Sequence, residues 1–394
     1  MKKLTSFITF SIAFTIFSCS SSDSVSTPTE TYPNVIAAFS GKIDLNNLSN
    51  YATQSKPAYI TKDNTAGNPI TDKGATLGRV LFYDKNLSSN NTISCASCHI
   101  QANAFGDDTD ASDGVNGTTT RHAMRLVNSR FSNETKFFWD ERATTLEAQT
   151  SQPIQNHIEM GFSGTSGDGS ITTLITKLQA IGYYKELFKY VYGSEEITET
   201  KLQNALAQFI RSIQSFDSKY DTGRAAVQND NQPFSNFTAQ ENQGKNLFLT
   251  PPVFDTSGVR ISGGFGCAGC HAPPEFDIDP NTKNNGVIGV LNGTGIDITN
   301  TKAPSLRDLL NANGTPNGPM MHTGSFATLQ NVIGHYGTIT IAPRNTNLDQ
   351  RLTPNGLGQQ LNINATEVTA LIAFIKTLTG TNVYTDPKWS SPFK

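Results

Sequence analysis

The 394-residue sequence predicts a mainly α-helical protein in which one structural plan occurs twice in tandem. Two observations lead to this fold class. The pentapeptide pattern C-x-x-C-H occurs at residues 95–99 and again at residues 267–271. Each copy follows a helix-forming stretch, and each is followed at a distance by apolar residues at helical spacing. We therefore expect two similar halves, each with long loops around its pentapeptide.

Both pentapeptides predict the covalent attachment of haem c. In each, two cysteines would add to the haem vinyl groups and the next histidine would bind the iron as its proximal ligand. The residues concerned are Cys95, Cys98 and His99 in the first copy and Cys267, Cys270 and His271 in the second. A bare C-x-x-C also suits zinc, disulfide exchange or an iron–sulfur cluster. The histidine that ends both copies favours two haem groups.

The first half begins with a helix that ends near residues 77–82 (LGRVLF) and leads into the loop of the first haem. It closes with a second helix, in which six apolar side chains fall on one face. These are Leu202, Ala205, Leu206, Phe209, Ile210 and Ile213. Such a stripe is more typical of a surface that faces a core than of a binding surface.

The second half repeats this order. Residues 243–248 (QGKNLF) end a helix that begins with a capping box at Thr238 and Glu241. Its closing helix carries a matching apolar stripe, made by Val368, Leu371, Ile372, Ile375 and Leu378. The order of helix, haem loop, variable segment and closing helix is that of a cytochrome c domain. We expect two such domains at 36–225 and 226–394, with the boundary in the polar stretch 221–237.

The N-terminal segment predicts export from the cytoplasm. Residues 1–18 join a charged start to an apolar run that is too short for a permanent membrane helix, as in a signal peptide. Residues 16–19 (IFSC) resemble a lipobox, in which Cys19 would be lipidated and become the first residue of the mature chain. Residues 19–35 would form a flexible tether. We expect an extracytoplasmic lipoprotein of the periplasm or outer membrane; a secreted protein with an unmodified thiol is the alternative.

Charge and composition narrow the partners. The formal net charge is −3 and there is no run of basic residues, which argues against nucleic acid. Apolar residues make up only 36% of the chain, a low share for this length. Two buried porphyrins would supply the missing apolar volume, so domains rich in loops remain compatible with this composition.

Between the repeats, 137–142 (FFWDER), 146–149 (LEAQ) and 158–161 (IEMG) form a segment that ordinary electron carriers do not need. Here the chain resembles the bacterial dihaem cytochrome c peroxidases, the family that includes the MauG-type enzymes. Four segments match motifs of that family in order, at 77–82 (LGRVLF), in the Phe-Trp-Asp block of 137–142, at 302–307 (KAPSLR) and at 321–326 (MHTGSF). The resemblance covers most of residues 70–380. It implies that the haem of His99 is the peroxidatic one and that the haem of His271 receives and passes on electrons.

The same resemblance implies roles for three side chains spaced ten residues apart. Glu159 would move a proton between the two peroxide oxygens as a general acid–base group. Gln149 would orient peroxide or water by hydrogen bonding. Trp139 would lie between the haems and carry electrons or a radical. Outside the family context, each would more often be an ordinary surface or core residue.

The sixth ligand of the second haem departs from the peroxidase pattern. The well-known peroxidases place a methionine fourteen residues after the histidine of a His-x-Gly motif, which here is His322. That position holds Tyr336, as in MauG-type enzymes. A phenolate stabilises oxidised iron, whereas a thioether raises the reduction potential. Met320, Met321 and His335 are rival ligands, and the absence of a protein ligand is a further alternative.

A second departure concerns the distal side of the first haem. Peroxidases that need reductive activation carry a removable histidine where this chain has Val115, and no histidine occurs in 107–120. His122 is the next candidate, as a distal ligand or a hydrogen-bonding residue. It aligns with an asparagine that helps to hold calcium between the haems, and imidazole suits calcium poorly. Carbonyl groups near Asn317 and Pro319 could still supply part of a calcium site.

Three functions follow from these features. The resemblance implies an enzyme that reduces hydrogen peroxide to water with electrons from a small cytochrome c or a cupredoxin. Tyr336 favours a MauG-like oxidase that acts through high-valent iron on a protein or organic substrate. A plain electron-transfer cytochrome is disfavoured by Gln149 and Glu159. Members of the family are often dimers, although this sequence shows no interface.

Overall fold

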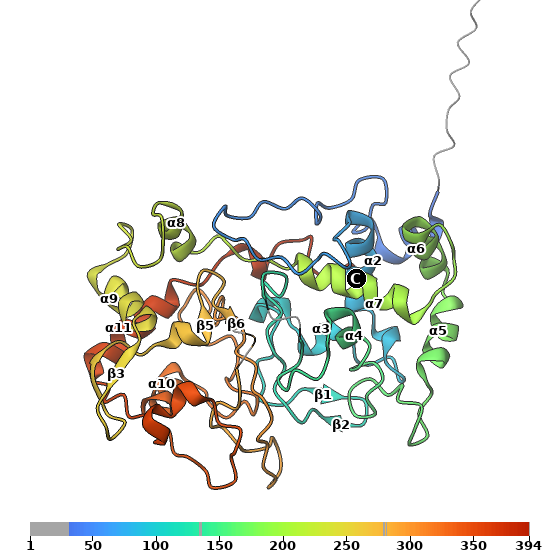
Figure 1. Ribbon diagram of the computed structural model, residues 1–394. Coiled ribbons are helices and arrows are strands. Elements are labelled where there is room, and N and C mark those ends of the chain that lie inside the picture. The colour runs from blue at the N-terminus through green and yellow to red at the C-terminus, as the bar shows by residue number, and fades with distance from the viewer. Residues whose placement is uncertain (1–30, 134–135, 279, 281, 394) are drawn as a thin grey trace, which may run out of the picture. The chain divides into compact units, whose positions relative to one another are not determined.

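The computed structural model describes residues 31–133, 136–278, 280 and 282–393, and helices dominate their regular structure (Figure 1). The predicted signal peptide, Cys19 and most of the predicted tether lie outside the described residues. The α-helices are α1 (Pro33–Phe39), α2 (Asp72–Tyr83), α3 (Cys95–Cys98), α4 (Leu146–Thr150), α5 (Ile171–Gln179), α6 (Gly182–Tyr192), α7 (Glu199–Ser212), α8 (Lys219–Ala225), α9 (Ala239–Leu249), α10 (Leu329–Gly337) and α11 (Ala365–Lys376). Short 3₁₀ helices are η1 (Lys85–Leu87), η2 (Gln101–Asn103), η3 (Cys267–Gly269), η4 (Gln350–Leu352), η5 (Pro354–Gly356) and η6 (Asn382–Tyr384).

The described strands are short and pair only with their sequence neighbours. They are β1 (Asp113–Gly114), β2 (Gly117–Thr118), β3 (Pro252–Phe254), β4 (Arg260–Gly263), β5 (His271–Ala272) and β6 (Asp277–Ile278). The pairs β1–β2, β3–β4 and β5–β6 are each antiparallel, and the β3–β4 register shifts between Val253 and Phe254. The mainly helical prediction is therefore confirmed. No helix within the described residues is long and apolar enough to cross a membrane.

A pair of crossing helices occurs in each half, and a glycine allows each crossing. In the first half α2 packs on α7, and a Cβ atom at Gly78 would lie 2.0 Å from the Ala205 carbonyl oxygen. In the second half α9 packs on α11, and a Cβ atom at Gly244 would lie 1.9 Å from the Ala370 carbonyl oxygen. The helices therefore touch through their backbones, which explains why the repeated motif contains glycine.

Two apolar clusters surround these helix pairs. The whole predicted stripe of α7 is buried in the first cluster, where Leu202 is 1% exposed and Phe209 fully buried. In the second half, Leu371 and Ile375 of α11 and Leu378, two residues beyond its end, are buried in the second cluster, and Val368 and Ile372 pack against it half-buried. The predicted stripes thus face the core in both halves.

The helix starts follow from capping side chains. The predicted capping box of α9 is present, since the Glu241 backbone N–H donates to Thr238 Oγ1 at 3.1 Å and the Thr238 N–H donates to Glu241 Oε2 at 2.6 Å. Thr71 and Thr198 cap α2 and α7 in the same way through their hydroxyl oxygens. These caps satisfy backbone donors that the first turn leaves free.

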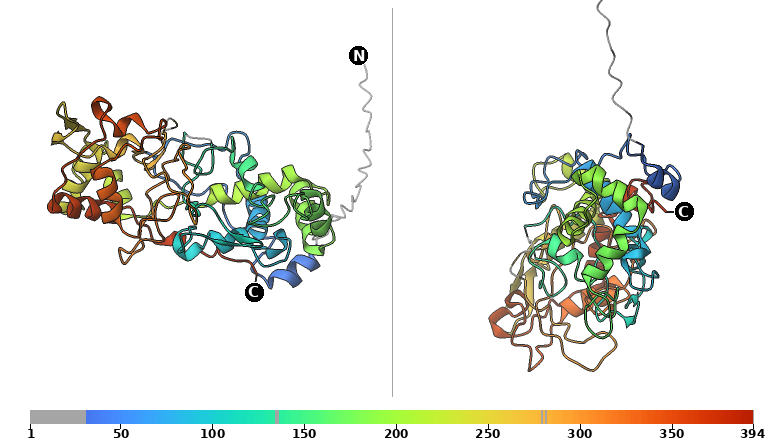
Figure 2. Two further views of the ribbon diagram at one scale, coloured as in Figure 1. Left: turned by 90° about the horizontal axis from the view of Figure 1, so that it is seen from below. Right: turned by 90° about the vertical axis from the view of Figure 1, so that its right-hand side faces the viewer.

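The two ends of the described chain meet. Val383 and Trp389 belong to the first cluster although they follow the second helix pair, and the rings of Phe39 and Phe393 lie 5.2 Å apart. Figure 2 shows the C-terminal end of the chain beside α1. At the other end of the chain, α1 begins at Pro33, so the last three residues of the predicted tether, 33–35, are helical. Val35 is buried in the first cluster, which ties this helix to the core.

The described residues from Tyr32 onward form one compact unit. The polar stretch 221–237 is also part of the folded protein: it contains most of α8, and Phe234 and Phe237 are buried in the second cluster. The limits of the two domains within this unit stay a prediction.

Candidate functional site

The first pentapeptide lies on the wall of a cavity of about 240 Å³. Cys95 and Cys98 begin and end the one-turn helix α3. The His99 Nδ1 donates to the Phe105 carbonyl oxygen at 3.2 Å, which leaves the Nε2 lone pair for a metal. Burial lowers the pKa of His99, so that the ring stays neutral and can act as a ligand.

A second cavity, of about 470 Å³, carries the other pentapeptide. Cys267 begins η3, and Cys270 and His271 follow it on the cavity wall. The His271 Nδ1 donates to the Pro304 carbonyl oxygen at 3.0 Å, so that this histidine is oriented in the same manner as His99. Burial lowers the pKa of His271 to about 4.

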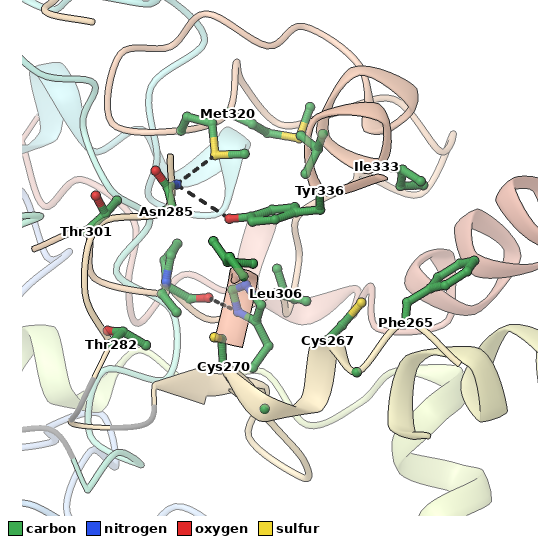
Figure 3. Close-up of a pocket in the computed structure, with 18 of the residues that line it drawn as sticks. Phe265, Cys267, Cys270, Thr282, Asn285, Thr301, Leu306, Met320, Ile333 and Tyr336 are labelled. Carbon is green, nitrogen blue, oxygen red and sulfur yellow. Dashed lines mark hydrogen bonds between the residues drawn. The ribbon is translucent and has the colours of Figure 1, made fainter. Parts of the chain in front are cut away.

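Tyr336 lines the second cavity from α10, on the side that faces Cys270 (Figure 3). The side-chain nitrogen of Asn285 lies 3.5 Å from the Tyr336 hydroxyl oxygen and 3.4 Å from the Met321 sulfur. Burial raises the pKa of Tyr336, so the free side chain carries its proton at neutral pH. The hydroxyl is thus held in the cavity by one long, weak contact with Asn285.

The rival ligands separate by position. Met320 and Met321 line the same cavity as Tyr336. His335 is not among the described residues that line this cavity, and the His335 Nε2 lies 2.9 Å from the Asn285 backbone oxygen. Three of the four candidate ligands therefore line the second cavity, and His335 does not.

Gln149 and Glu159 both lie on the wall of the first cavity with His99. Gln149 projects from α4, a short helix capped by Thr145, whose Oγ1 accepts the Ala148 N–H at 3.0 Å. Burial raises the pKa of Glu159 above the ordinary value of a glutamate. The positive charge of Arg142 opposes this shift.

The turn that carries Glu159 is fixed by the loop at β1 and β2. The Val115 N–H donates to the Glu159 carbonyl oxygen at 3.0 Å, and the Glu159 N–H donates to Asn156 Oδ1 at 3.1 Å. A Cβ atom at Gly114 would lie 2.1 Å from the Ile158 carbonyl oxygen, so only glycine fits there. Val115, the position of the absent histidine, therefore supports the backbone of Glu159.

Seven residues line both cavities and form what we call the shared wall: His122, Ala123, Met124, Arg125, Trp139, Lys302 and Pro304. Trp139 is 9% exposed, and its Nε1–H donates to the His122 carbonyl oxygen at 2.7 Å. The Lys302 N–H donates to the Trp139 carbonyl oxygen at 2.8 Å. One hydrogen bond thus holds the indole and another holds the backbone of Trp139, which lines both cavities.

Comparison with known proteins shows the family to which this chain belongs. A family model described as di-haem cytochrome c peroxidase matches residues 72–230. The chain is 30% identical over 322 residues to the methylamine utilization protein MauG of Methylophilus methylotrophus, across 79% of this chain and 84% of that protein. The chain belongs to the di-haem cytochrome c peroxidase family. It is also 28% identical over 320 residues to the cytochrome c551 peroxidase of Nitrosomonas europaea, across 78% of this chain and 80% of that one.

A solved structure gives the same family relation. The crystal structure of a MauG-like protein associated with microbial copper homeostasis matches with a TM-score of 0.66 at 28% identity. The match covers 86% of this chain and 99% of that one. As a member of the di-haem family, the chain binds two c-type haems. The two cavities fit them, because each offers two cysteines and a histidine whose Nδ1 is already bonded to a carbonyl group.

His122 and the two residues predicted to offer calcium carbonyls lie at or near the second cavity. His122 is 6% exposed in the shared wall, and its Nδ1 lies 2.9 Å from the Thr109 carbonyl oxygen. Pro319 lines the second cavity, whereas the Asn317 side-chain nitrogen donates to the Asp308 carbonyl oxygen at 2.8 Å. Within the described part of the chain, no cluster of three or more His, Cys, Asp or Glu side chains could hold a metal ion.

Sequence reasoning missed two residues of these di-haem sites. Arg125 is the single cation in the otherwise apolar run 123–127 (AMRLV), which is a signal that could have been noticed. Asn285 lies in a long loop and reaches Tyr336 across 51 residues of sequence, so no local pattern points to it. Both residues line the second cavity, and Arg125 lines the first as well.

Proposed function

We propose that the protein reduces hydrogen peroxide to water at the haem of His99, with electrons that enter through the haem of His271. A small cytochrome c or a cupredoxin outside the cytoplasm would supply the electrons. The observation that carries the proposal is that Gln149 and Glu159, from separate segments, meet His99 in one cavity. A plain electron carrier does not need a buried carboxyl group beside its iron.

Glu159 would move the protons of this reaction. Haem iron, when bound, would supply a coordination site for peroxide and the two electrons for breaking its O–O bond. Two electrons and two protons together convert one peroxide into two waters. Glu159 would take a proton from one peroxide oxygen and return it to the other, the leaving oxygen, as general acid. Its raised pKa supports this role, because a carboxyl group that is too acidic would not hold the proton.

Gln149 would position peroxide or water, and Trp139 would connect the two haems. The Gln149 amide has both a donor and an acceptor, so it can hold peroxide or water over the first haem in one orientation. Trp139 stands in the shared wall with its N–H bonded to the His122 carbonyl, which fixes the ring between the cavities. An oxidisable ring in this place would shorten the path of electrons from one haem to the other.

The substitution Glu159→Gln tests this assignment. We expect peroxide reduction to fall about a hundredfold or more, since a positioned acid–base group contributes that much, while two haems per chain remain bound. Glu196→Gln is the matched control, because the Glu196 side chain is 71% exposed and outside both cavities. Unchanged turnover in Glu159→Gln would remove Glu159 from its role.

A MauG-like oxidase is the second candidate, because Tyr336 reaches the second cavity. Peroxide and a reduced donor separate the functions. Rapid donor oxidation supports the peroxidase. A long-lived oxidised state with poor donor turnover supports the oxidase, and no reaction with peroxide supports a simple electron carrier.

We infer further that the first haem has an open distal position, because Val115 occupies the place of the removable histidine. His122 would then serve as a hydrogen-bonding residue of the wall. A fully low-spin spectrum of that haem in the oxidised protein would contradict the inference. The lipid anchor at Cys19, a homodimer, and calcium at the carbonyls of Asn317 and Pro319 remain predictions.

A further inference from the structure

Arg125 occupies a position that the proposed reaction does not explain. It belongs to the shared wall and lines both haem cavities. Its stem fits tightly against the backbone, since a Cβ atom at Gly106 would lie 2.7 Å from Arg125 Cγ. Its Nη2 donates to the Ser305 carbonyl oxygen at 3.0 Å. The side chain is therefore held at both its stem and its tip.

These two anchor points adjoin the groups that orient the proximal histidines. Gly106 follows Phe105, whose carbonyl oxygen accepts the His99 Nδ1–H. Ser305 follows Pro304, whose carbonyl oxygen accepts the His271 Nδ1–H. Arg125 therefore spans the distance between the backbone segments that fix the two histidines.

The charge of Arg125 has no counter-ion in the described part of the protein. Its Nε is buried without a hydrogen-bond partner there, and no carboxylate of a described residue forms a salt bridge with it. Asp308 acts on it only through its charge at longer range, and no hydrogen bond or salt bridge joins these two described side chains, although the Asp308 Oδ2 also lacks a hydrogen-bond partner. Arg125 is half-buried, and haem in the two cavities that it lines would remove more of it from water. An unpaired cation in such a place is costly, so a site of this kind calls for an anion.

Two buried cations of the same chain, Arg307 and Lys302, have their partners within the protein. Arg307 is fully buried and makes two bonds of 2.9 Å to the carboxylate of Asp221. Lys302, the other cation of the shared wall, donates to the Lys136 carbonyl oxygen at 2.6 Å. Arg125 has one carbonyl bond and no carboxylate. The propionates of the two haems are the carboxylates that the protein acquires at these cavities.

We propose that Arg125 is a cation shared by the two haem sites, which pairs with haem propionates and raises the reduction potentials of both haems together. A positive charge beside a haem favours the reduced iron, because reduction removes one positive charge from the iron. The low-dielectric wall strengthens this effect on both sides. The inference depends on the presence of the two haems and is independent of peroxide turnover.

Redox titration of the haem-loaded protein without peroxide tests the proposal. In Arg125→Gln we expect the reduction equilibrium constant of each haem to fall about tenfold, which is about 59 mV for a one-electron couple. Arg125→Lys should restore most of both shifts. Arg142→Gln is the control, because Arg142 lines only the first cavity, and any shift should be confined to the haem of His99.

A shift of one haem alone in Arg125→Gln, or of neither, would overturn the proposal. If Arg125→Gln does not retain haem, resonance Raman spectra of the wild type and Arg125→Lys decide. The propionate bending modes of both haems should then differ between the two proteins, and identical modes would be equally damaging. Because no measurement uses peroxide, loss of peroxidase activity cannot be mistaken for failure of this inference.

Discussion

Replacing Gly244 by alanine should destabilise the protein through the crossing of α9 and α11. The added Cβ atom would lie 1.9 Å from the Ala370 carbonyl oxygen, whereas ordinary contacts begin at 3.4 Å. The obstacle is backbone, so the helices would have to separate by about 1.5 Å. Overpacking of this kind costs about 1–3 kcal/mol, and a close backbone clash belongs at the upper end. Alanine regains about 1 kcal/mol of helix propensity, which leaves a net loss of about 2 kcal/mol.

Gly334 provides the matched control for this substitution. It also lies inside a helix, α10, but nothing stands within 4 Å of an added Cβ atom. Gly334→Ala should therefore stabilise the protein by up to about 1 kcal/mol. Chemical denaturation of the haem-loaded proteins, followed by circular dichroism, should move the midpoint in opposite directions for the two variants.

The same experiment has a second readout at the haem. The Phe265 N–H donates to the Leu247 carbonyl oxygen at 2.7 Å, so the end of α9 holds the start of the second haem loop. Displacement of α9 should therefore disturb the spectrum of the second haem before that of the first. A Gly244→Ala protein as stable as the wild type, or one stabilised like Gly334→Ala, would refute the close-crossing argument.

Three further predictions concern buried charge and ligation. Asp221→Ala should cost about 3–5 kcal/mol in denaturation because it strands the buried Arg307, and a loss below 1 kcal/mol would contradict this. Burial raises the pKa of Asp308 to about 6, so the fold favours its protonated form and wild-type stability should fall as pH rises from about 4 to about 6. Asp308→Asn should flatten that part of the stability profile by up to about 3 kcal/mol, and an unchanged slope would argue against it. Tyr336→Met should raise the potential of the second haem in a redox titration, whereas an unchanged potential would argue against Tyr336 as its ligand.

Local sequence patterns predicted the parts of the fold that depend on local physics. The capping box at Thr238 and the stripe that includes Phe209 involve residues a few positions apart, so helix geometry alone brings them together. The two-residue strands, such as β1 and β2, were not predicted because so short a segment has no periodicity. The packing of Trp389 in the first cluster was not predicted either, since its contact with Ser212 spans 177 residues.

The haem sites divide in the same way. The pentapeptides predicted which cysteines attach haem and which histidines bind iron. The family resemblance pointed to Glu159 and Gln149, and both line the first cavity. The importance of Arg125 and Asn285 becomes visible only from their contacts with residues far away in the sequence, Ser305 and Tyr336. A single arginine or asparagine in a loop has many ordinary explanations, so the sequence alone could not select them.

The two haem sites are repeated in sequence but depend on different parts of the chain. His99 is oriented by Phe105, six residues away in its own loop. His271 is oriented by Pro304, 33 residues away, in the segment whose Lys302 N–H also holds the Trp139 carbonyl oxygen. A displacement of that segment would therefore disturb the second haem and the indole of the shared wall together. The first histidine would keep its own carbonyl bond, so the proposed electron path through Trp139 should be more sensitive to that displacement than the position of His99.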